Sequence, residues 1–260
     1  YFKLNMKLIS SFRDFQFTAG IHEYPDVEQT TGIKFSIVII AENDQSYIHT
    51  GEYETAILLI EGKGEFIYQD QTISVQRSNW IDENPCVIHL PKDDIVQINA
   101  QNQCRVAIVQ TKNSDSFPGR VFIPNDIDVE HRGKDQLGDT CYRLVRLAFD
   151  RTNAPKAAKL VLGEVLNFPG KWSSYPPHHH KHPEIYYYEF SPNEGYGHGE
   201  LGDKVYKLKH QDLLMITNSL DHSQVSAPGY YLYYIWAIRH LANDPYTGFE
   251  YTKPFDQLIS

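Results

Sequence analysis

The sequence predicts an all-β protein built from two β-barrels in tandem. Short apolar runs, separated by Gly, Pro, Asn and Asp, replace the helical periodicity that an α protein would show. The composition holds 18 Tyr and 13 Phe against 2 Met, and large aromatic residues favour pleated, half-buried surfaces. The two halves of the chain also repeat a similar order of parts, which indicates two copies of one barrel unit.

The first half contains a regular series of strand-sized segments. They are "KFSIVII" at 34–40, "TAILLIEGKGEFIYQDQTISV" at 55–75, "CVIHLP" at 86–91, "DIVQINA" at 94–100 and "CRVAIVQT" at 104–111. Turn residues within the longest segment predict three strands, with turns at 62–64 and around Asp70. The glycines of "EGKGE" lack the strand–helix context of a phosphate loop, so we interpret them as a hairpin turn.

A polar segment with several Gly and Pro residues follows Thr111 and marks the boundary between domains. We therefore expect an N-terminal barrel at 1–115, and a linker with a C-terminal barrel at 116–260. Strands resume at 141–149, 159–168, 184–190, 204–208, 212–218 and 230–238. Short helices are expected only near 126–129 or after Ala242.

The repeat is defined by landmarks in similar order. Glu54 opens an apolar strand and Val96 follows later, while Glu184 and His222 occupy corresponding places in the second half. The second copy thus has an imidazole where the first has an aliphatic side chain. Because Val96 offers no lone pair, we expect the first barrel to be structural and to bind no metal.

Composition excludes several classes of function. The formal charge is −9 without a cluster of Lys or Arg, which argues against nucleic-acid binding. No apolar run approaches the ~20 residues of a membrane helix, and the first residues lack the apolar core of a signal peptide. The three scattered cysteines suggest a reducing compartment, so we expect a cytoplasmic protein without membrane partners. The sequence leaves a homo-oligomer open.

The segment "PPHHHKHPEIYYYEF" carries the chemistry. On a regular strand, alternate side chains share a face. One face would hold His178, His180, His182, Glu184, Tyr186 and Tyr188. Two imidazoles and a carboxylate suit a divalent metal such as Zn, Mn, Fe, Co or Ni, with His222 as the natural fourth ligand. A histidine run can also be a solvated loop, but the in-phase Glu184 favours a metal site.

The His-x-His-x-x-x-Glu stretch with a later His resembles the cupin pattern. "GKWSSYPPH", "EIYYYEF" and "APGYYLYY" further resemble the 5-deoxy-glucuronate isomerase family of inositol catabolism, two-cupin proteins related to 5-keto-4-deoxyuronate isomerase. The resemblance implies a bicupin of two double-stranded β-helix (jelly-roll) barrels. It implies an aldose–ketose isomerase acting on a small uronate-type sugar acid. It also implies the metal ligands His178, His180, Glu184 and His222, although the shorter insert before Glu184 leaves His180 and His182 as an alternative pair.

Departures from the family pattern affect the pocket wall. "TNSLDHS" replaces the family's turn before the last His, Trp236 stands where Asn is expected, and "DKVYKL" lacks an Arg that would hold a substrate carboxylate. The catalytic acid or base stays unassigned, with His182, Tyr186 and Tyr188 as candidates by strand phase. Two other functions remain open: a metal-dependent cupin dioxygenase, and a non-catalytic sugar-binding cupin.

Overall fold

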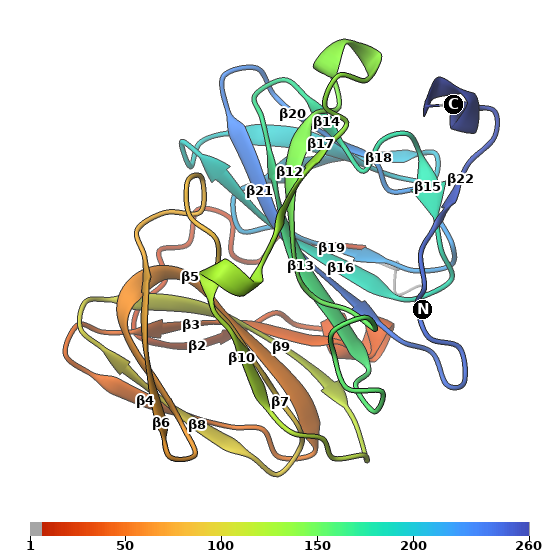
Figure 1. Ribbon diagram of the computed structural model, residues 1–260. Helices are drawn as coiled ribbons and strands as arrows, with labels where there is room; N and C mark the ends of the chain where they lie inside the picture. Colours follow the sequence, from red (N-terminus) through yellow and green to blue (C-terminus); the bar gives the residue numbers. More distant parts are fainter. Residues whose placement is uncertain (1–6, 260) are drawn as a thin grey trace, which may run out of the picture. The chain divides into compact units, whose positions relative to one another are not determined.

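Strands make up nearly all of the regular structure in residues 7–259, the part of the chain that the computed structural model describes. These residues form two units (Figure 1). The N-terminal unit comprises 16–128 and 148–161, and the C-terminal unit comprises 7–15, 129–147 and 162–259. The domain limit after residue 115 stays a prediction.

The N-terminal unit is a barrel of two sheets that share one long strand. Its strands are β2 (Gly20–Glu23), β3 (Lys34–Ile40), β4 (Gln45–His49), β5 (Tyr53–Tyr68), β6 (Gln71–Arg77), β7 (Val87–Leu90), β8 (Ile95–Ala100), β9 (Cys104–Lys112) and β10 (Arg120–Phe122). One sheet has the order β10-β7-β5-β9-β3-β2, while β6 and β8 pair with the far end of β5. Aliphatic side chains from both sheets, including Ile57, Ile88 and Val96, fill the interior.

The predicted turn at 62–64 is wrong. β5 continues from Tyr53 to Tyr68 without a hairpin, and its pairing with β9 shifts register between Leu59 and Glu61. Gly62 adopts a φ of +134°, and a Cβ there would lie 2.7 Å from the Cα of Cys104. Glycine therefore lets the strand bend from one sheet into the other, which is the work of a β-bulge. The turn predicted around Asp70 is present between β5 and β6.

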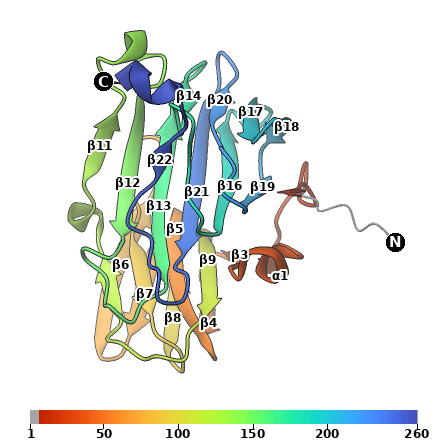
Figure 2. The same cartoon turned by 90° about the vertical axis from the view of Figure 1, so that its right-hand side faces the viewer.

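The C-terminal unit holds the remaining strands. They are β1 (Leu8–Ile9), β11 (Val129–Arg132), β12 (Arg143–Phe149), β13 (Leu160–Asn167), β14 (Trp172–Ser173), β15 (His178–His179), β16 (Glu184–Ser191), β17 (Tyr196–Leu201), β18 (Lys204–Lys209), β19 (Leu213–Ile216), β20 (Gln224–Ser226), β21 (Tyr231–Arg239) and β22 (Glu250–Tyr251). β12 and β13 each continue past the limits of this unit. One sheet has the order β1-β19-β16-β21-β13-β12-β11 and another the order β14-β20-β17-β18. Figure 2 shows β16 between its antiparallel neighbours β19 and β21.

The same strand pairing occurs in both units. β16 pairs with β19 and β21 as β5 pairs with β7 and β9, and β17 pairs with β18 and β20 as the far end of β5 pairs with β6 and β8. The registers match as well: Gly64 lies opposite Ala100, and Gly197 lies opposite Ser226. A Cβ at Gly64 or Gly197 would meet a carbonyl oxygen of the neighbouring strand at 2.1 or 2.5 Å.

The register identifies which residues correspond between the barrels. Val96 lies four residues before Ala100, and His222 lies four residues before Ser226. Val96 and His222 therefore correspond, as the sequence predicts. The counterpart of Glu184 is Thr55, because Thr55 lies opposite Leu90 as Glu184 lies opposite Ile216, at the ends of β7 and β19. The landmark Glu54 is therefore one residue out of register, and its side chain faces the other side of the strand.

Helical structure in the described residues is sparse. It consists of α1 (Val27–Thr31) and the 3-10 turns η1 (Pro124–Asp126), η2 (Leu137–Asp139) and η3 (Phe255–Ile259). The sequence did not predict α1. The short helix expected near 126–129 is instead η1, which ends at Asp126 before β11 begins at Val129, and η3 is the helical turn that follows Ala242. None of the helices within 7–259 has the length and apolar character needed to cross a membrane.

Candidate metal centre

Three side chains in the C-terminal unit bring ligand atoms together: His180, Glu184 and His222, whose atoms lie within 4.8 Å of one another. Nε2 of His180 lies 2.9 Å from Oε2 of Glu184, and Nε2 of His222 lies 3.4 Å from the same oxygen. All three side chains are buried. Glu184 opens β16 on the inward face that continues through Tyr186 and Tyr188, so the strand aims the carboxylate into the barrel.

Backbone carbonyls determine the tautomers of two histidines. Nδ1 of His222 donates to the carbonyl of Leu220 at 2.9 Å, and Nδ1 of His178 donates to that of Pro176 at 3.1 Å. In a neutral imidazole, a protonated Nδ1 leaves the lone pair on Nε2, the form that binds a metal. Burial lowers the pKa of His222, and it lowers the pKa of His178 well below the ordinary value, with a further decrease from neighbouring His222. Both rings are therefore kept neutral.

The other two predicted histidines differ in their surroundings. The ring of His178 lies 4.7 Å from that of His222, between centroids, although His178 is not among the three convergent residues. Nε2 of His182 donates to the carbonyl of Asp244 at 2.9 Å, and its ring lies 6.1 Å from that of His180. β15 ends at His179 and β16 begins at Glu184, so the regular alternation assumed from the sequence does not extend through His182.

The donor set fits a divalent metal ion. Nδ1 of His180 and Nε2 of His222 are buried and have no hydrogen-bond partner in the structure. An unsatisfied buried nitrogen costs roughly 1–3 kcal/mol. An ion beside Glu184 would give the Nε2 lone pair of His222 a partner and would compensate the buried carboxylate charge. Two to three imidazoles and one carboxylate are typical ligands of Zn and of neighbouring transition metals.

A small pocket adjoins the cluster. Its volume is about 60 Å³, well below the ~300–1,000 Å³ of typical ligand pockets. The polar side chains in its wall include Arg132, Arg143, Ser174, His178, His180, Glu184, Tyr186 and Tyr234. The sequence suggested that an Arg for a substrate carboxylate is lacking at "DKVYKL", but Arg132 and Arg143 supply guanidinium groups from β11 and β12, where they lie opposite each other. Their cross-strand pairing could not be found from spacing along the chain.

The C-terminal segment closes the pocket. The ring of Phe249 lies 4.1 Å from that of His178, and the ring of Tyr246 lies 5.0 Å from that of His180, between centroids. A second cavity of about 390 Å³ shares His180 and Phe249 as wall residues. Gly248, next to Phe249, has a φ of +142° and open space around its Cα. Phe249 and His180 thus lie in the walls of both cavities.

The candidate acid–base residues are distributed unevenly around the pocket. Among His182, Tyr186 and Tyr188, only Tyr186 lines the small pocket. The hydroxyl of Tyr186 lies 3.3 Å from the hydroxyl of Ser174. The hydroxyl of Tyr188 donates to Oε1 of Gln224 at 2.6 Å. Burial raises the pKa of both tyrosines well above the ordinary value, so both phenols are protonated. His182 lines the second cavity.

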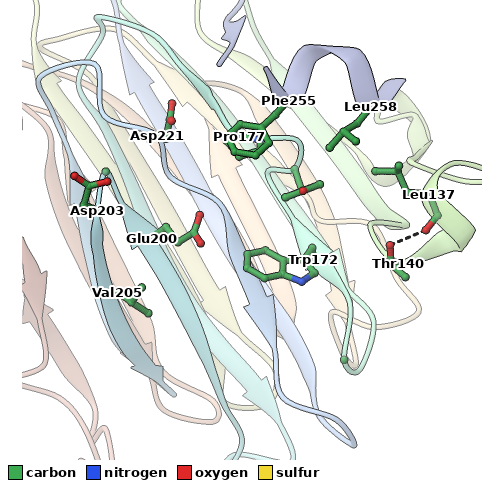
Figure 3. A pocket seen from close by; sticks show the side chains of 13 residues that line it. Leu137, Thr140, Trp172, Pro177, Glu200, Asp203, Val205, Asp221, Phe255 and Leu258 are labelled. Atoms are coloured by element: carbon green, nitrogen blue, oxygen red, sulfur yellow. Dashed lines mark hydrogen bonds between the residues drawn. The ribbon is translucent and has the colours of Figure 1, made fainter. Parts of the chain in front are cut away.

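A larger pocket of about 950 Å³ lies elsewhere in the C-terminal unit (Figure 3). Figure 3 shows Phe255 and Leu258 of η3 on one side, and the carboxylates of Glu200, Asp203 and Asp221 on the other. Burial and the nearby charge of Asp221 raise the pKa of Glu200. No basic residue is among the described residues that line it, so this pocket repels anions.

Comparisons with known proteins agree with this architecture. The family model described as KduI/IolB matches residues 9–256. The chain is 29% identical over 255 residues to a protein from Lacticaseibacillus casei named 5-deoxy-glucuronate isomerase, covering 88% of this chain and 91% of the relative. It is 23% identical over 225 residues to a protein of the same name from Geobacillus kaustophilus, covering 78% of each.

Solved structures extend the likeness to the fold. An IolB-like protein from Salmonella typhimurium LT2 has a TM-score of 0.83 at 18% identity, covering 94% of this chain and 97% of that one. Oxalate decarboxylase from Lactobacillus farciminis has a TM-score of 0.67 at 11% identity, covering 91% and 85%. Together with the repeated strand pairing, these likenesses confirm the predicted all-β bicupin class.

Proposed function

This chain belongs to the KduI/IolB family, and on that premise we propose that it is a metal-dependent aldose–ketose isomerase of a uronate-type sugar acid. The substrate class follows from the relatives named 5-deoxy-glucuronate isomerase. The observation that carries the metal dependence is the convergence of His180, His222 and Glu184 on one point of the barrel interior. Inositol catabolism, a cytoplasmic location and a homo-oligomer stay predictions.

We propose His178, His180, Glu184 and His222 as the metal ligands. The Nδ1–H donation of His178 and His222 to backbone carbonyls holds both rings in the tautomer that ligation requires. Nδ1 of His182 is also buried without a hydrogen-bond partner. The alternative pair of His180 and His182 is less favourable for another reason: His178 lines the pocket beside Glu184, whereas His182 lines the second cavity. A bound divalent ion would act as a Lewis acid on adjacent carbonyl and hydroxyl oxygens and make the intervening C–H more acidic.

The protein's own groups would then handle protons and water. The protonated phenol of Tyr186 lies in the pocket wall, where it can donate a hydrogen bond or a proton to a substrate oxygen. The rings of Phe249 and Tyr246 cover the histidines and would keep water from the reacting carbons. Such shielding favours a proton transfer between neighbouring carbons over exchange with solvent.

The test is turnover of uronates without oxygen. Purified protein is analysed for metal content, and then incubated anaerobically with a panel of uronates while ¹H NMR follows loss of the aldose and appearance of the ketose signals. We expect about one metal per chain and conversion that stops after chelation and returns when metal is restored. Turnover that requires and consumes oxygen would identify a dioxygenase. Binding of sugar acids without turnover under any of Zn, Mn, Fe, Co or Ni would identify a non-catalytic binding protein.

A further inference from the structure

Arg143 is a buried cation in the wall of the metal pocket. It opens β12, its residue is 5% exposed, and its Nη1 donates to the carbonyls of Cys141 at 2.8 Å and Tyr175 at 3.4 Å. These two contacts fix the guanidinium in place. Its remaining N–H groups donate to no protein atom among the described residues. The nitrogens of these groups keep some exposed surface.

Arg143 makes no ion pair within residues 7–259. Its charge helps to lower the pKa of Glu130, but that carboxylate is held by Arg132, and Glu184 is engaged by His180. Burial lowers the pKa of Arg143, and the nearby cation of Arg132 acts in the same direction. A buried charge without a counter-ion is costly, so such a group in a binding pocket indicates an anionic ligand.

Arg132 is not equivalent. Although it lies opposite Arg143 in the β11–β12 pairing, its Nε and Nη2 both donate to the carboxylate of Glu130, at 2.7 and 2.5 Å. This bidentate pair uses one edge of the Arg132 fork and neutralises its charge. Arg143 is therefore the cation in this pocket that is left for a ligand.

The geometry points to Arg143 as the residue that binds the carboxylate of the sugar acid, in the same pocket as the histidine and glutamate cluster. A planar guanidinium matches a carboxylate better than an ammonium group does, because two parallel N–H···O bonds form. Arg143 lies close enough to His178 for its charge to lower the pKa of that ring. Binding the acid group at Arg143 would thus fix the distance from the carboxylate to the reacting carbons. This inference rests on the proposed function for its substrate class.

The experiment compares a sugar acid with its neutral amide. Isothermal titration calorimetry measures the affinity of D-glucuronate and of D-glucuronamide for the full chain, with metal and after chelation. We expect the wild type to prefer the acid by about 30-fold or more, from the cost of leaving a buried charge unpaired. The preference should persist without metal, which separates binding by Arg143 from binding by the ion.

Variants assign the preference to one side chain. Arg143→Gln should bind acid and amide equally, and Arg143→Lys should show an intermediate preference because it keeps the charge and loses the fork. Arg105→Gln, which removes a cation paired with Glu61 in the N-terminal unit, is the control and should keep the full preference. Circular dichroism monitors folding. If Arg143→Gln does not fold, Arg143→Lys and the wild-type comparison decide.

The outcomes separate this inference from the proposed function. A wild type without preference for the acid, a preference that vanishes on chelation, or Arg143 variants with the full preference would overturn the role of Arg143. These results would leave isomerase activity intact. If the preference for the acid over the amide depends on Arg143 but the protein isomerises no uronate, the carboxylate site would be supported and the proposed isomerase function refuted.

Discussion

Replacing His222 by Ala tests the proposed metal centre most directly. His222 is 1% exposed and donates one hydrogen bond, to the carbonyl of Leu220. Its loss costs the metal-free protein about 2 kcal/mol from one hydrogen bond and a cavity, but it also removes the unsatisfied Nε2, which costs roughly 1–3 kcal/mol, so the net change should be within about 1 kcal/mol. The strands of the barrel are untouched, so the far-ultraviolet circular dichroism should stay unchanged.

The increase in stability on metal binding tests the site more directly than the stability of the metal-free protein. At a free metal concentration of ~1,000 Kd, binding stabilises the folded state by about 4.1 kcal/mol, which raises Tm by roughly 8–16 °C in a chain of this size. If loss of one ligand weakens binding ~1,000-fold, only about 0.4 kcal/mol remains. The metal-induced shift should then fall to about 1 °C, occupancy should fall to about half at that metal concentration, and turnover should fall with it.

The first barrel supplies a matched control. Val96 occupies the position that corresponds to His222 and is fully buried. Val96→Ala should cost about 2 kcal/mol through the cavity that it leaves, yet keep the whole metal-induced shift. Differential scanning fluorimetry of the three proteins, with and without metal, gives the comparison. A His222→Ala variant that retains the wild-type shift, or a Val96→Ala variant that loses it, would refute the proposed site.

Four further outcomes are expected. His178→Ala should lose the metal-induced Tm shift and His182→Ala should keep it; the opposite pattern, measured by fluorimetry, would make His182 the ligand. Tyr186→Phe should lower kcat about 100-fold while the Kd for a sugar acid stays within twofold, and an unchanged kcat would remove Tyr186 from the mechanism. Phe249→Ala should connect the two cavities, so stopped-flow binding should become faster; an unchanged rate would mean that Phe249 does not limit entry. Because burial raises the pKa of Cys86 to about 12, this thiol should resist Ellman's reagent at pH 8 until the protein is denatured, and rapid native labelling at Cys86 would contradict its burial.

Strand positions could be predicted well where apolar runs are bounded by turn residues. The run 34–40 coincides with β3, and the seven residues of β16 that carry "EIYYYEF" were expected as a strand. The prediction of a hairpin at "EGKGE" was wrong, because a glycine that permits a turn also permits a bulge. Only the partner strand distinguishes the two, and the approach of Gly62 to Cys104 cannot be inferred from nearby residues.

The site was partly predictable for a similar reason. Strand phase predicted that His180 and Glu184 share a face, but on a continuous strand they would lie roughly 13 Å apart. They meet because the strand is interrupted between His179 and Glu184. His222 could be proposed because the repeat places it at the end of a neighbouring strand. Arg143 could not be found in this way, since its approach to the pocket depends on the pairing of β12 in a sheet whose order is non-local. The one-residue offset of Glu54 has the same origin, because strand faces are fixed by register.

Matched registers reduce the difference between the barrels to particular side chains. Inside the first, Thr55 accepts a hydrogen bond from Gln110 at 3.0 Å and Val96 packs among aliphatic residues, so both positions are satisfied without a ligand. Inside the second, Glu184 and His222 occupy the same positions, and Nε2 of His222 has no hydrogen-bond partner. A buried carboxylate and an unpaired imidazole reduce the stability of an empty barrel. The second barrel thus gives up stability that ligand binding would restore, and this coupling is why metal should stabilise the wild-type fold and leave His222→Ala nearly unaffected.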